Sequence, residues 1–181
     1  MDRFNRENSA YSFDGIDDFI QTNFNFYIQP MSISVWFLSN VNCGERPIVD
    51  SDSFGRWGQS IIQGYWSGND RLFVQYHTGE YESPISIIPF KWYHAVVLFE
   101  NSKVRLFVNN KFVGEEKYNQ RQMEGSTFTR FGTHNEYAPQ RFEGKIDDIR
   151  IYNRILNEDE KTDYIMRNRV LNSYLLPHFS Y

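Results

Sequence analysis

The sequence contains almost no cysteine, no surplus of basic residues and no long apolar run. The single Cys43 cannot form an internal disulfide, so the fold must be stabilised by its hydrophobic core alone. There are 19 Lys and Arg residues against 23 Asp and Glu, for a net charge of −4. Because the basic residues form no stripe, we do not expect nucleic acid binding. No apolar stretch approaches the ~20 residues that a membrane-spanning helix needs.

The sequence also lacks the marks of a secreted chain at its start. Residues 1–7 are polar and contain no apolar core of the kind found in a signal peptide. We therefore expect the chain as given to remain where it is made, unless a partner carries it or a signal has been removed.

Aromatic residues, by contrast, are abundant: 16 Phe, 12 Tyr and 4 Trp among 181 residues. Such residues favour the half-buried surface of a pleated sheet. The length suits one domain with a sizeable core, and no Pro-, Gly- or Ser-rich linker divides the chain. Composition therefore favours a single, mostly β domain.

Alternating apolar and polar residues predict several short strands. In 31–38, for example, Ile33 and Val35 fall on one face and Ser34 and Trp36 on the other. The predicted strands cover residues 31–38, 71–77, 92–99, 103–108, 111–113 and 141–152. Many short strands separated by turns are typical of a sandwich or barrel.

Two local sequence signals predict a hairpin turn and a short helix. Asn109 and Asn110 tolerate the left-handed conformation that a tight hairpin turn requires, so 103–113 is predicted to be a hairpin. Asn157 is a suitable N-cap for a short helix that extends to about residue 169, with acidic residues in its first turn. The last residues, 170–181, form an apolar tail that must cover either this domain or a neighbouring molecule.

Three segments, in this order, carry a family resemblance: 11–20 (YSFDGIDDFI), 91–111 (KWYHAVV, then KVRLFVNNK) and 142–156 (FEGKIDDIRIYNRIL). Together they resemble the laminin-G-like jelly roll of the concanavalin A-like lectin/glucanase superfamily. The resemblance implies an all-β fold, a two-sheet antiparallel β-sandwich with one short C-terminal helix. We divide the chain into an N-terminal arm (1–9), the sandwich (10–169) and the tail (170–181).

Catalytic motifs are missing from the sequence. Glucanases of this fold carry carboxylates in a Glu-x-Asp-x-x-Glu pattern, and no such segment is present. Gly-x-Ser-x-Gly and zinc-ligand spacings are absent too. Asp147 and Asp148 are adjacent, so we expect them on opposite faces of a strand. The prediction is that the protein is not an enzyme, and a divergent glycoside hydrolase ranks third among the possible functions.

A structural calcium ion is the one cofactor that the resemblance implies, close to the pairing of the first and last strands. Calcium prefers carboxylate and carbonyl oxygens, and Asp14, Asp18 and Asp147 match the family motifs. The alternative is that Asp14 and Asp17 only shape the turn at Gly15 and that Asp147 caps a loop.

Carbohydrate binding is the leading activity that the resemblance implies. Sugars stack on aromatic rings and hydrogen-bond to polar groups in a groove. The candidate ligand-binding residues are Trp57, Tyr65, Trp66, Asn69, Tyr81 and His134. The alternative is that these aromatic residues cover the edges of the core.

Two functions therefore remain open. In one, the chain is a lectin-like module that binds carbohydrate or a glycosylated surface. In the other it is a structural or assembly protein, such as a component of a virus or phage particle, that makes protein contacts and oligomers through the tail 170–181. Both functions imply a position outside cells or on the surface of a particle.

Overall fold

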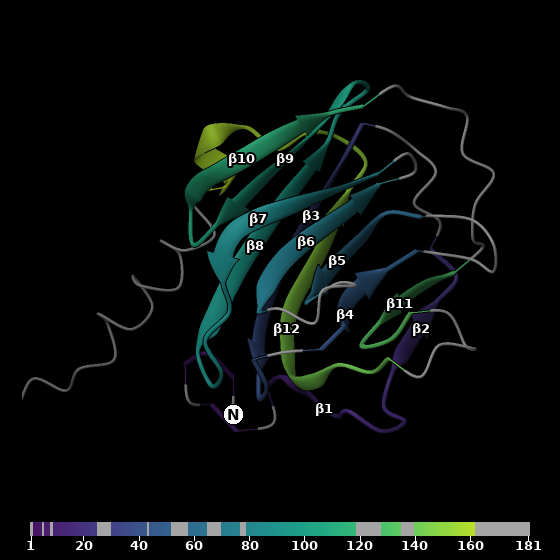
Figure 1. The fold of residues 1–181 in the computed structure, drawn as a ribbon, viewed down its shortest axis with the longest axis vertical. Coiled ribbons are helices and arrows are strands. Elements are labelled where there is room, and N and C mark those ends of the chain that lie inside the picture. Colours follow the sequence, from purple (N-terminus) through teal and green to yellow (C-terminus); the bar gives the residue numbers. More distant parts are fainter. Residues whose placement is uncertain are drawn as a thin grey trace, which may run out of the picture.

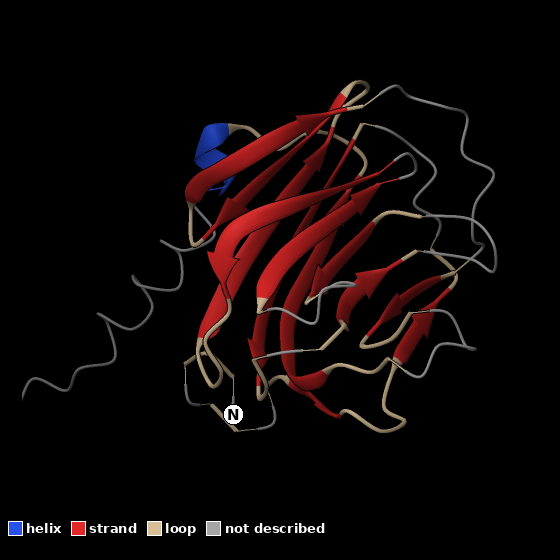
Figure 2. Ribbon diagram, viewed as in Figure 1, coloured by secondary structure: helices blue, strands red, loops and turns tan. Residues whose placement is uncertain are grey.

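The computed structural model describes residues 2–4, 6–7, 9–24, 30–42, 44–51, 58–64, 70–76, 79–118, 128–134 and 140–161. These residues form two antiparallel six-stranded sheets packed face to face (Figure 1). Figure 2 shows that strands dominate both layers and that the described helix is short. The predicted two-sheet β-sandwich with one short helix is confirmed.

The twelve strands are short, as the alternation predicted. They are β1 (Tyr11–Asp14), β2 (Ile20–Thr22), β3 (Met31–Ser39), β4 (Arg46–Asp50), β5 (Ser60–Gln63), β6 (Arg71–Tyr76), β7 (Gly79–Ser86), β8 (Trp92–Phe99), β9 (Lys103–Val108), β10 (Lys111–Lys117), β11 (Thr129–Phe131) and β12 (Glu143–Tyr152).

The strand order brings the first and last strands together. The first sheet, here called sheet A, has the order β1-β12-β3-β8-β9-β10, and sheet B has the order β2-β11-β4-β5-β6-β7. Tyr11 lies opposite Ile146, and Asp14 lies opposite Glu143. Two of the family-like segments, far apart in the sequence, therefore form one antiparallel pair.

The core lies between the two sheets and is made by one side of each strand. Ile33, Val35 and Phe37 of β3 are fully buried there, whereas Trp36 between them is only half-buried. Sheet B contributes the inward side chains of β4 to β6 in the same way. The alternation along each strand thus builds a single apolar layer that holds the sandwich together.

The hairpin between β9 and β10 has the predicted geometry. Asn109 and Asn110 have φ angles of 51° and 63°, the left-handed conformation that a type I′ turn needs at both central positions. The side-chain oxygen Oδ1 of Asn109 also accepts the backbone N–H of His94, at 2.9 Å. Asn109 therefore shapes the turn and ties it to β8.

The start of the predicted helix is confirmed. The Asn157 side chain accepts the N–H of Glu160 at 2.9 Å, and the Glu160 carboxylate accepts the N–H of Asn157 at 3.0 Å. This reciprocal pair is a capping box. The helix is described over residues 158–161; its predicted continuation to residue 169 and the tail 170–181 lie outside the described residues.

The segment that leads into this helix covers part of the outer face of sheet A. Leu156 packs with Val96, Leu98 and Phe107, which point away from the main core. Lys161 lies over the Phe107 ring with its Nζ atom 3.8 Å from the ring centroid. No helix in the described part of the chain is long and apolar enough to cross a membrane.

Candidate functional site

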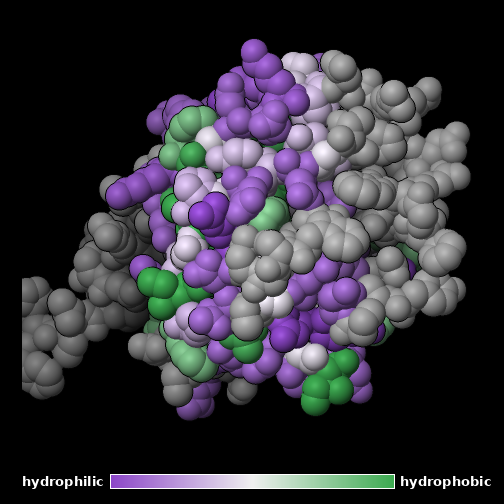
Figure 3. Space-filling view, viewed as in Figure 1, coloured by the Kyte–Doolittle hydropathy of each residue, from purple (hydrophilic) through white to green (hydrophobic). Residues whose placement is uncertain are grey.

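A row of polar residues crosses all six strands of sheet B on the face that points away from the core. Val49, Ile61 and Val74 belong to the core, so their neighbours along each strand face outward. Residues directly opposite in an antiparallel pair share a face. The register aligns six of them, which we call the polar row: Gln21, Arg130, Asp50, Ser60, Gln75 and Glu80. Figure 3 looks onto this side, where the described surface is largely hydrophilic.

The middle of the polar row is buried although it lies on an outer face. Asp50 and Ser60 have no exposed surface, and Arg130 is 6% exposed, whereas the end residues Gln21 and Glu80 are exposed. Buried polar groups are normally hydrogen-bonded. Accordingly, the Ser60 hydroxyl donates to Asp50 at 2.5 Å and the Arg130 Nε donates to Gln21 at 2.9 Å.

His134 joins the polar row to a further carboxylate. Its Nδ1 lies 3.3 Å from Oδ1 of Asp50, and its Nε2 lies 2.7 Å from Oε1 of Glu45. Burial by itself would lower the pKa of His134, but the hydrogen bonds to Asp50 and Glu45 and their negative charges outweigh it and raise the pKa to about 9. At neutral pH the ring is therefore an imidazolium that donates to both carboxylates.

Two arginines fix the backbone on either side of His134. The Arg141 guanidinium donates to the Thr133 hydroxyl at 2.5 Å, and Thr133 and Arg141 also form an isolated β-bridge. Arg46, at the start of β4, donates to the Arg141 carbonyl at 2.9 Å. These contacts link β4 to the segment after β11, so the position of His134 is set by the sheet rather than by a free loop.

The rim of this cluster is acidic. The Glu45 side chain keeps 18% of its surface exposed, and Glu80 is exposed at the end of the polar row. Burial raises the pKa of Glu80, and the charges of Glu82 and Glu45 raise it further. Glu45 is therefore a partly exposed acceptor next to the buried His134, and Glu80 is an exposed one at the end of the polar row.

The described contacts of Ser60, Asp50 and His134 differ from those of a serine nucleophile or a glycosidase acid. A serine nucleophile needs its hydroxyl paired with an imidazole base, but Ser60 donates to Asp50, and both ring nitrogens of His134 contact carboxylates. A glycosidase needs one protonated carboxyl group as a general acid. Here the carboxylates of Asp50 and Glu45 instead both contact the ring of His134.

The predicted ligand-binding residues fall into three groups. Trp57, Tyr65, Trp66 and Asn69 lie outside the described residues. His134 is part of the buried cluster. The Tyr81 ring packs against the core, and its hydroxyl donates to the Val113 carbonyl of β10 at 3.4 Å, so it lies between the two sheets at their β7–β10 edge.

Sequence reasoning missed most of the polar row. Asp50, Glu45, Ser60 and Arg130 belong to no motif that can be recognised in the sequence alone. The available signal was a polar residue at each outward position of an otherwise apolar strand, as in Asp50 beside Val49. Single strands show that pattern, but their alignment depends on pairing between distant segments.

The predicted calcium residues are divided between two places. Asp14 and Asp18 lie together with Asp17 in the exposed turn after β1, with carboxylate oxygens within 4.8 Å of one another. Asp14 Oδ1 accepts the N–H groups of Ile16 and Asp17, at 2.8 and 3.3 Å; the bond from Ile16 is the main reason that the pKa of Asp14 is lowered. Three carboxylates are a donor set that suits calcium, and the same contacts also shape the turn.

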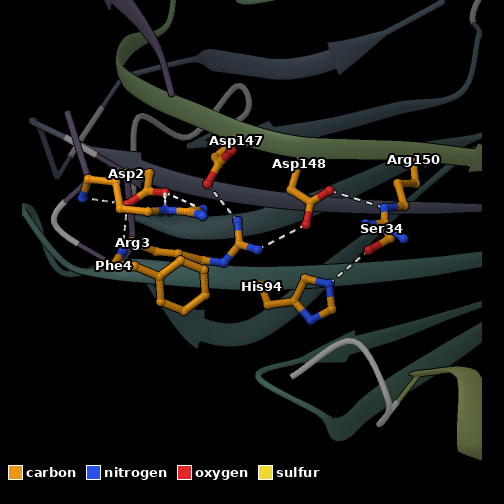
Figure 4. A network of polar contacts seen from close by, with 9 residues as sticks. Asp2, Arg3, Phe4, Ser34, His94, Asp147, Asp148 and Arg150 are labelled. Carbon is orange, nitrogen blue, oxygen red and sulfur yellow. Dashed lines mark hydrogen bonds and ion pairs between the residues drawn. The ribbon is translucent and has the colours of Figure 1, made fainter. Parts of the chain in front are cut away.

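Asp147 lies elsewhere, on the outer face of sheet A (Figure 4). It pairs with Arg3 of the N-terminal arm at 2.5 Å, and Asp148 pairs with the same guanidinium at 2.9 Å. The expectation that these adjacent residues point to opposite faces is wrong. The register of β12 against β3 shifts between Asp147 and Arg150, and Asp148 has a φ of 49°. This β-bulge turns both carboxylates to one side.

Comparisons with known proteins agree with this architecture. A sequence-family model described as the concanavalin A-like lectin/glucanases superfamily matches residues 14–160. Among curated protein sequences, none matches the chain.

Three solved structures illustrate the likeness in fold. Domain 4 of a GH43 extracellular arabinanase from Geobacillus stearothermophilus, in complex with arabinotriose, is 16% identical, with a TM-score of 0.65 over 84% of this chain and 86% of that one. The CBM40 of a Ruminococcus gnavus IT-sialidase, bound to α2,3-sialyllactose, is 8% identical, with a TM-score of 0.70 over 86% and 96%. A heptameric SAP-like pentraxin from Limulus polyphemus is 13% identical, with a TM-score of 0.63 over 83% and 78%.

Proposed function

Because the chain belongs to the concanavalin A-like lectin/glucanase superfamily, we propose that it is a non-catalytic, lectin-like module that binds carbohydrate on the outer face of sheet B. Two of the similar structures hold a sugar, arabinotriose in one and sialyllactose in the other. Their low identity makes them a guide to the fold, and the ligand class is our inference. A carbohydrate displayed outside a cell or on the surface of a particle fits this role.

The observation that carries the proposal is the polar row together with His134, which contacts the row at Asp50. Sugar hydroxyls are bound by donors and acceptors that are already held in place, since ordering flexible side chains costs affinity. His134 is buried and holds Glu45 through its Nε2. Glu45 and Glu80, which reach solvent, would accept hydrogen bonds from the ligand, with the buried residues behind them providing rigidity.

The aromatic part of the site is supplied, in this proposal, by the connection that joins Asp50 to Ser60, two neighbouring members of the polar row. Trp57 belongs to this connection in the sequence, whereas Tyr65, Trp66 and Asn69 follow Gln63, at the other end of β5. An aromatic face gives a sugar ring an apolar surface, while the acidic rim binds its hydroxyls. This division of roles is testable one residue at a time.

A glycan array, run with and without a chelator, tests the proposal directly. We expect binding to a restricted set of glycans that survives at moderate salt, because the contacts to neutral hydroxyls are not screened. Absence of binding across diverse polysaccharides and oligosaccharides would count against a lectin-like function.

Point variants then locate the site. We expect Glu45→Gln and Trp57→Ala each to weaken binding about five- to thirtyfold, because each would remove one contact of ~1–2 kcal/mol. Glu115→Gln, in β10 of sheet A, is the matched control for the loss of one carboxylate, and it should bind like the parent. Equal weakening by the control would mean that net charge, not this face, determines binding.

The non-catalytic part of the proposal has its own assay. Incubation with the glycans that bind, followed by measurement of reducing ends, should show no release over hours. Release that disappears in Glu45→Gln would instead assign the chain to the hydrolases of its superfamily.

A further inference from the structure

The bulge in β12 builds a cation site on the outer face of sheet A, opposite the face proposed to bind carbohydrate. Arg3 Nη1 lies 2.5 Å from Asp147 Oδ2, and Nη2 lies 2.9 Å from Asp148 Oδ2. Each terminal nitrogen therefore has its own carboxylate, an arrangement that fits the planar fork of a guanidinium. Figure 4 shows the two carboxylates converging on the Arg3 side chain.

Aromatic rings form the floor and one wall of this site. The Arg3 Cζ atom lies 4.8 Å from the centroid of the Trp36 ring and 4.6 Å from that of Phe4. Trp36 in turn stacks on His94, with centroids 4.8 Å apart and planes at 15°. His94 is bound to Ser34 through Nε2 at 2.8 Å, so the floor is fixed by β3 and β8.

The site is enclosed rather than superficial. The side chains of Arg3, Asp147 and Asp148 keep only 6, 12 and 21% of their surface exposed. A guanidinium in such a place combines ion pairing with stacking, whereas an ammonium group can reach the carboxylates only as a point charge. The geometry is therefore selective for arginine over lysine.

The two carboxylates and the aromatic floor belong to a different part of the chain from Arg3 and Phe4, which both lie in the N-terminal arm. Asp147, Asp148 and Trp36 lie on paired strands, β12 and β3. The arm that supplies Arg3 also has internal bonds: the fully buried Asp2 carboxylate accepts the N–H groups of Phe4 and Arg6 at 2.8 and 2.9 Å. The carboxylates and the Trp36 ring are therefore positioned by the sheet, whereas Arg3 comes with the arm.

We propose that this pocket is a binding site for the guanidinium group of a peptide arginine, and that Arg3 is its occupant in cis. Without Arg3, two adjacent carboxylates would remain half-buried with Arg150, 3.0 Å from Asp148, as a neighbouring cation. Such a site gains free energy from any guanidinium that enters it. An arginine-bearing segment of a partner polypeptide competes with the arm for the same place.

The test uses the full-length chain with Arg3→Ala and two nine-residue peptides. One peptide has the sequence of residues 1–9 (MDRFNRENS), and the other carries lysine at its third position. We expect calorimetry to show that the arginine peptide binds the variant about tenfold more tightly than the lysine peptide, and that neither binds the parent chain to the same extent, since its pocket is filled. Adding Asp147→Asn and Asp148→Asn to the variant should abolish binding.

A second background keeps the test decisive if Arg3→Ala folds poorly. In Arg3→Lys the arm retains its charge, and the arginine peptide should still displace it and raise the melting temperature, while the lysine peptide should not. Equal effects of the two peptides, or no effect of either in both backgrounds, would contradict the proposal. Arg3 would then only form an intramolecular ion pair between the arm and sheet A. Neither result bears on carbohydrate binding, because that face belongs to sheet B.

Discussion

His134 and His94 are both buried, yet their surroundings drive their proton affinities in opposite directions. His134 lies between two carboxylates, and its pKa rises to about 9. The pKa of His94 falls to about 4, first because of burial and then because of the positive charge of Arg3. One side chain is therefore a cation at neutral pH and the other is neutral.

For His134 we expect the free energy of unfolding to decrease at alkaline pH. A pKa raised above the unfolded value of 6.5 means that the stabilisation is fully present below pH 6.5 and is lost as pH rises through about 9, by about 3 kcal/mol for a shift of this size. Chemical denaturation between pH 6 and 10 should show this loss, and His134→Gln should flatten it. A ring titration by NMR with a midpoint near 6.5 would contradict the bridged geometry.

For His94 we expect the free energy of unfolding to decrease as the pH falls into the acidic range. Its folded pKa is depressed, so the unfolded chain binds the proton more readily between pH 6.5 and 4, and stability falls by up to about 3 kcal/mol over that interval. His94→Gln, which retains a hydrogen-bonding group for Ser34, should remove this slope. Taken together, the two histidines place the stability maximum near pH 6.5. A parent chain most stable at pH 4 would contradict the assignment of His94, and one most stable at pH 9 would contradict that of His134.

At the scale of elements, turns and bulges decide where polar groups end up. The hairpin at Asn109 and Asn110 could be predicted because its cause is local: both residues tolerate positive φ. The bulge at Asp148 could not, because it depends on the register between β12 and β3, and alternation assumes a regular strand. The same limit applies to the polar row, whose members Asp50 and Ser60 are ten residues apart but paired across strands.

The Asn109–Asn110 turn yields a prediction for the hairpin. Asn110→Val should destabilise the fold by about 1–2 kcal/mol, because a β-branched residue is strained at a φ of 63°. Asn110→Gly is the control, since glycine adopts this conformation freely, and it should equal or exceed the parent. Urea denaturation measures both variants, and equal effects would contradict the turn type.

The acidic turn after β1 yields a prediction about calcium. We propose that Asp14, Asp17 and Asp18 bind the ion, in which case millimolar calcium should raise the melting temperature of the parent and a chelator should reverse the rise. Asp17→Asn is the informative variant: Asp14 and Asp18 accept backbone N–H groups that shape the turn, so replacing them would also disturb the local fold. An equal calcium response in Asp17→Asn would exclude this turn as the site.

At the scale of the whole molecule, the family-like segments predicted the architecture well because they are mostly structural. Phe142 and Ile146 are fully buried, and Gly144 adopts a φ of 150°, where a side chain is strained. Such residues report the fold and say little about a ligand. The face that we propose to bind carbohydrate is assembled from strands with no shared motif, so its location required the pairing of all six strands of sheet B.

The apolar tail 170–181 leads to a prediction about assembly. If the tail covers a second copy, native mass measurement should show the full-length chain as an oligomer and the chain ending at residue 169 as a monomer, because exposed apolar segments drive association. Monomers in both cases at high concentration would contradict self-assembly through the tail. Glycan binding by the shortened chain would then separate the two proposed roles.

The pairing of β1 with β12 also has a mechanical consequence. Tyr11, where β1 begins, lies opposite Ile146, so the start of β1 and the end of β12 at Tyr152 point toward the same end of the sandwich. Tension applied between these two points would open the pair one hydrogen bond at a time, like a zipper, instead of shearing all of them at once. A single-molecule pulling experiment should therefore find that β1 detaches at low force before the rest of the sandwich yields.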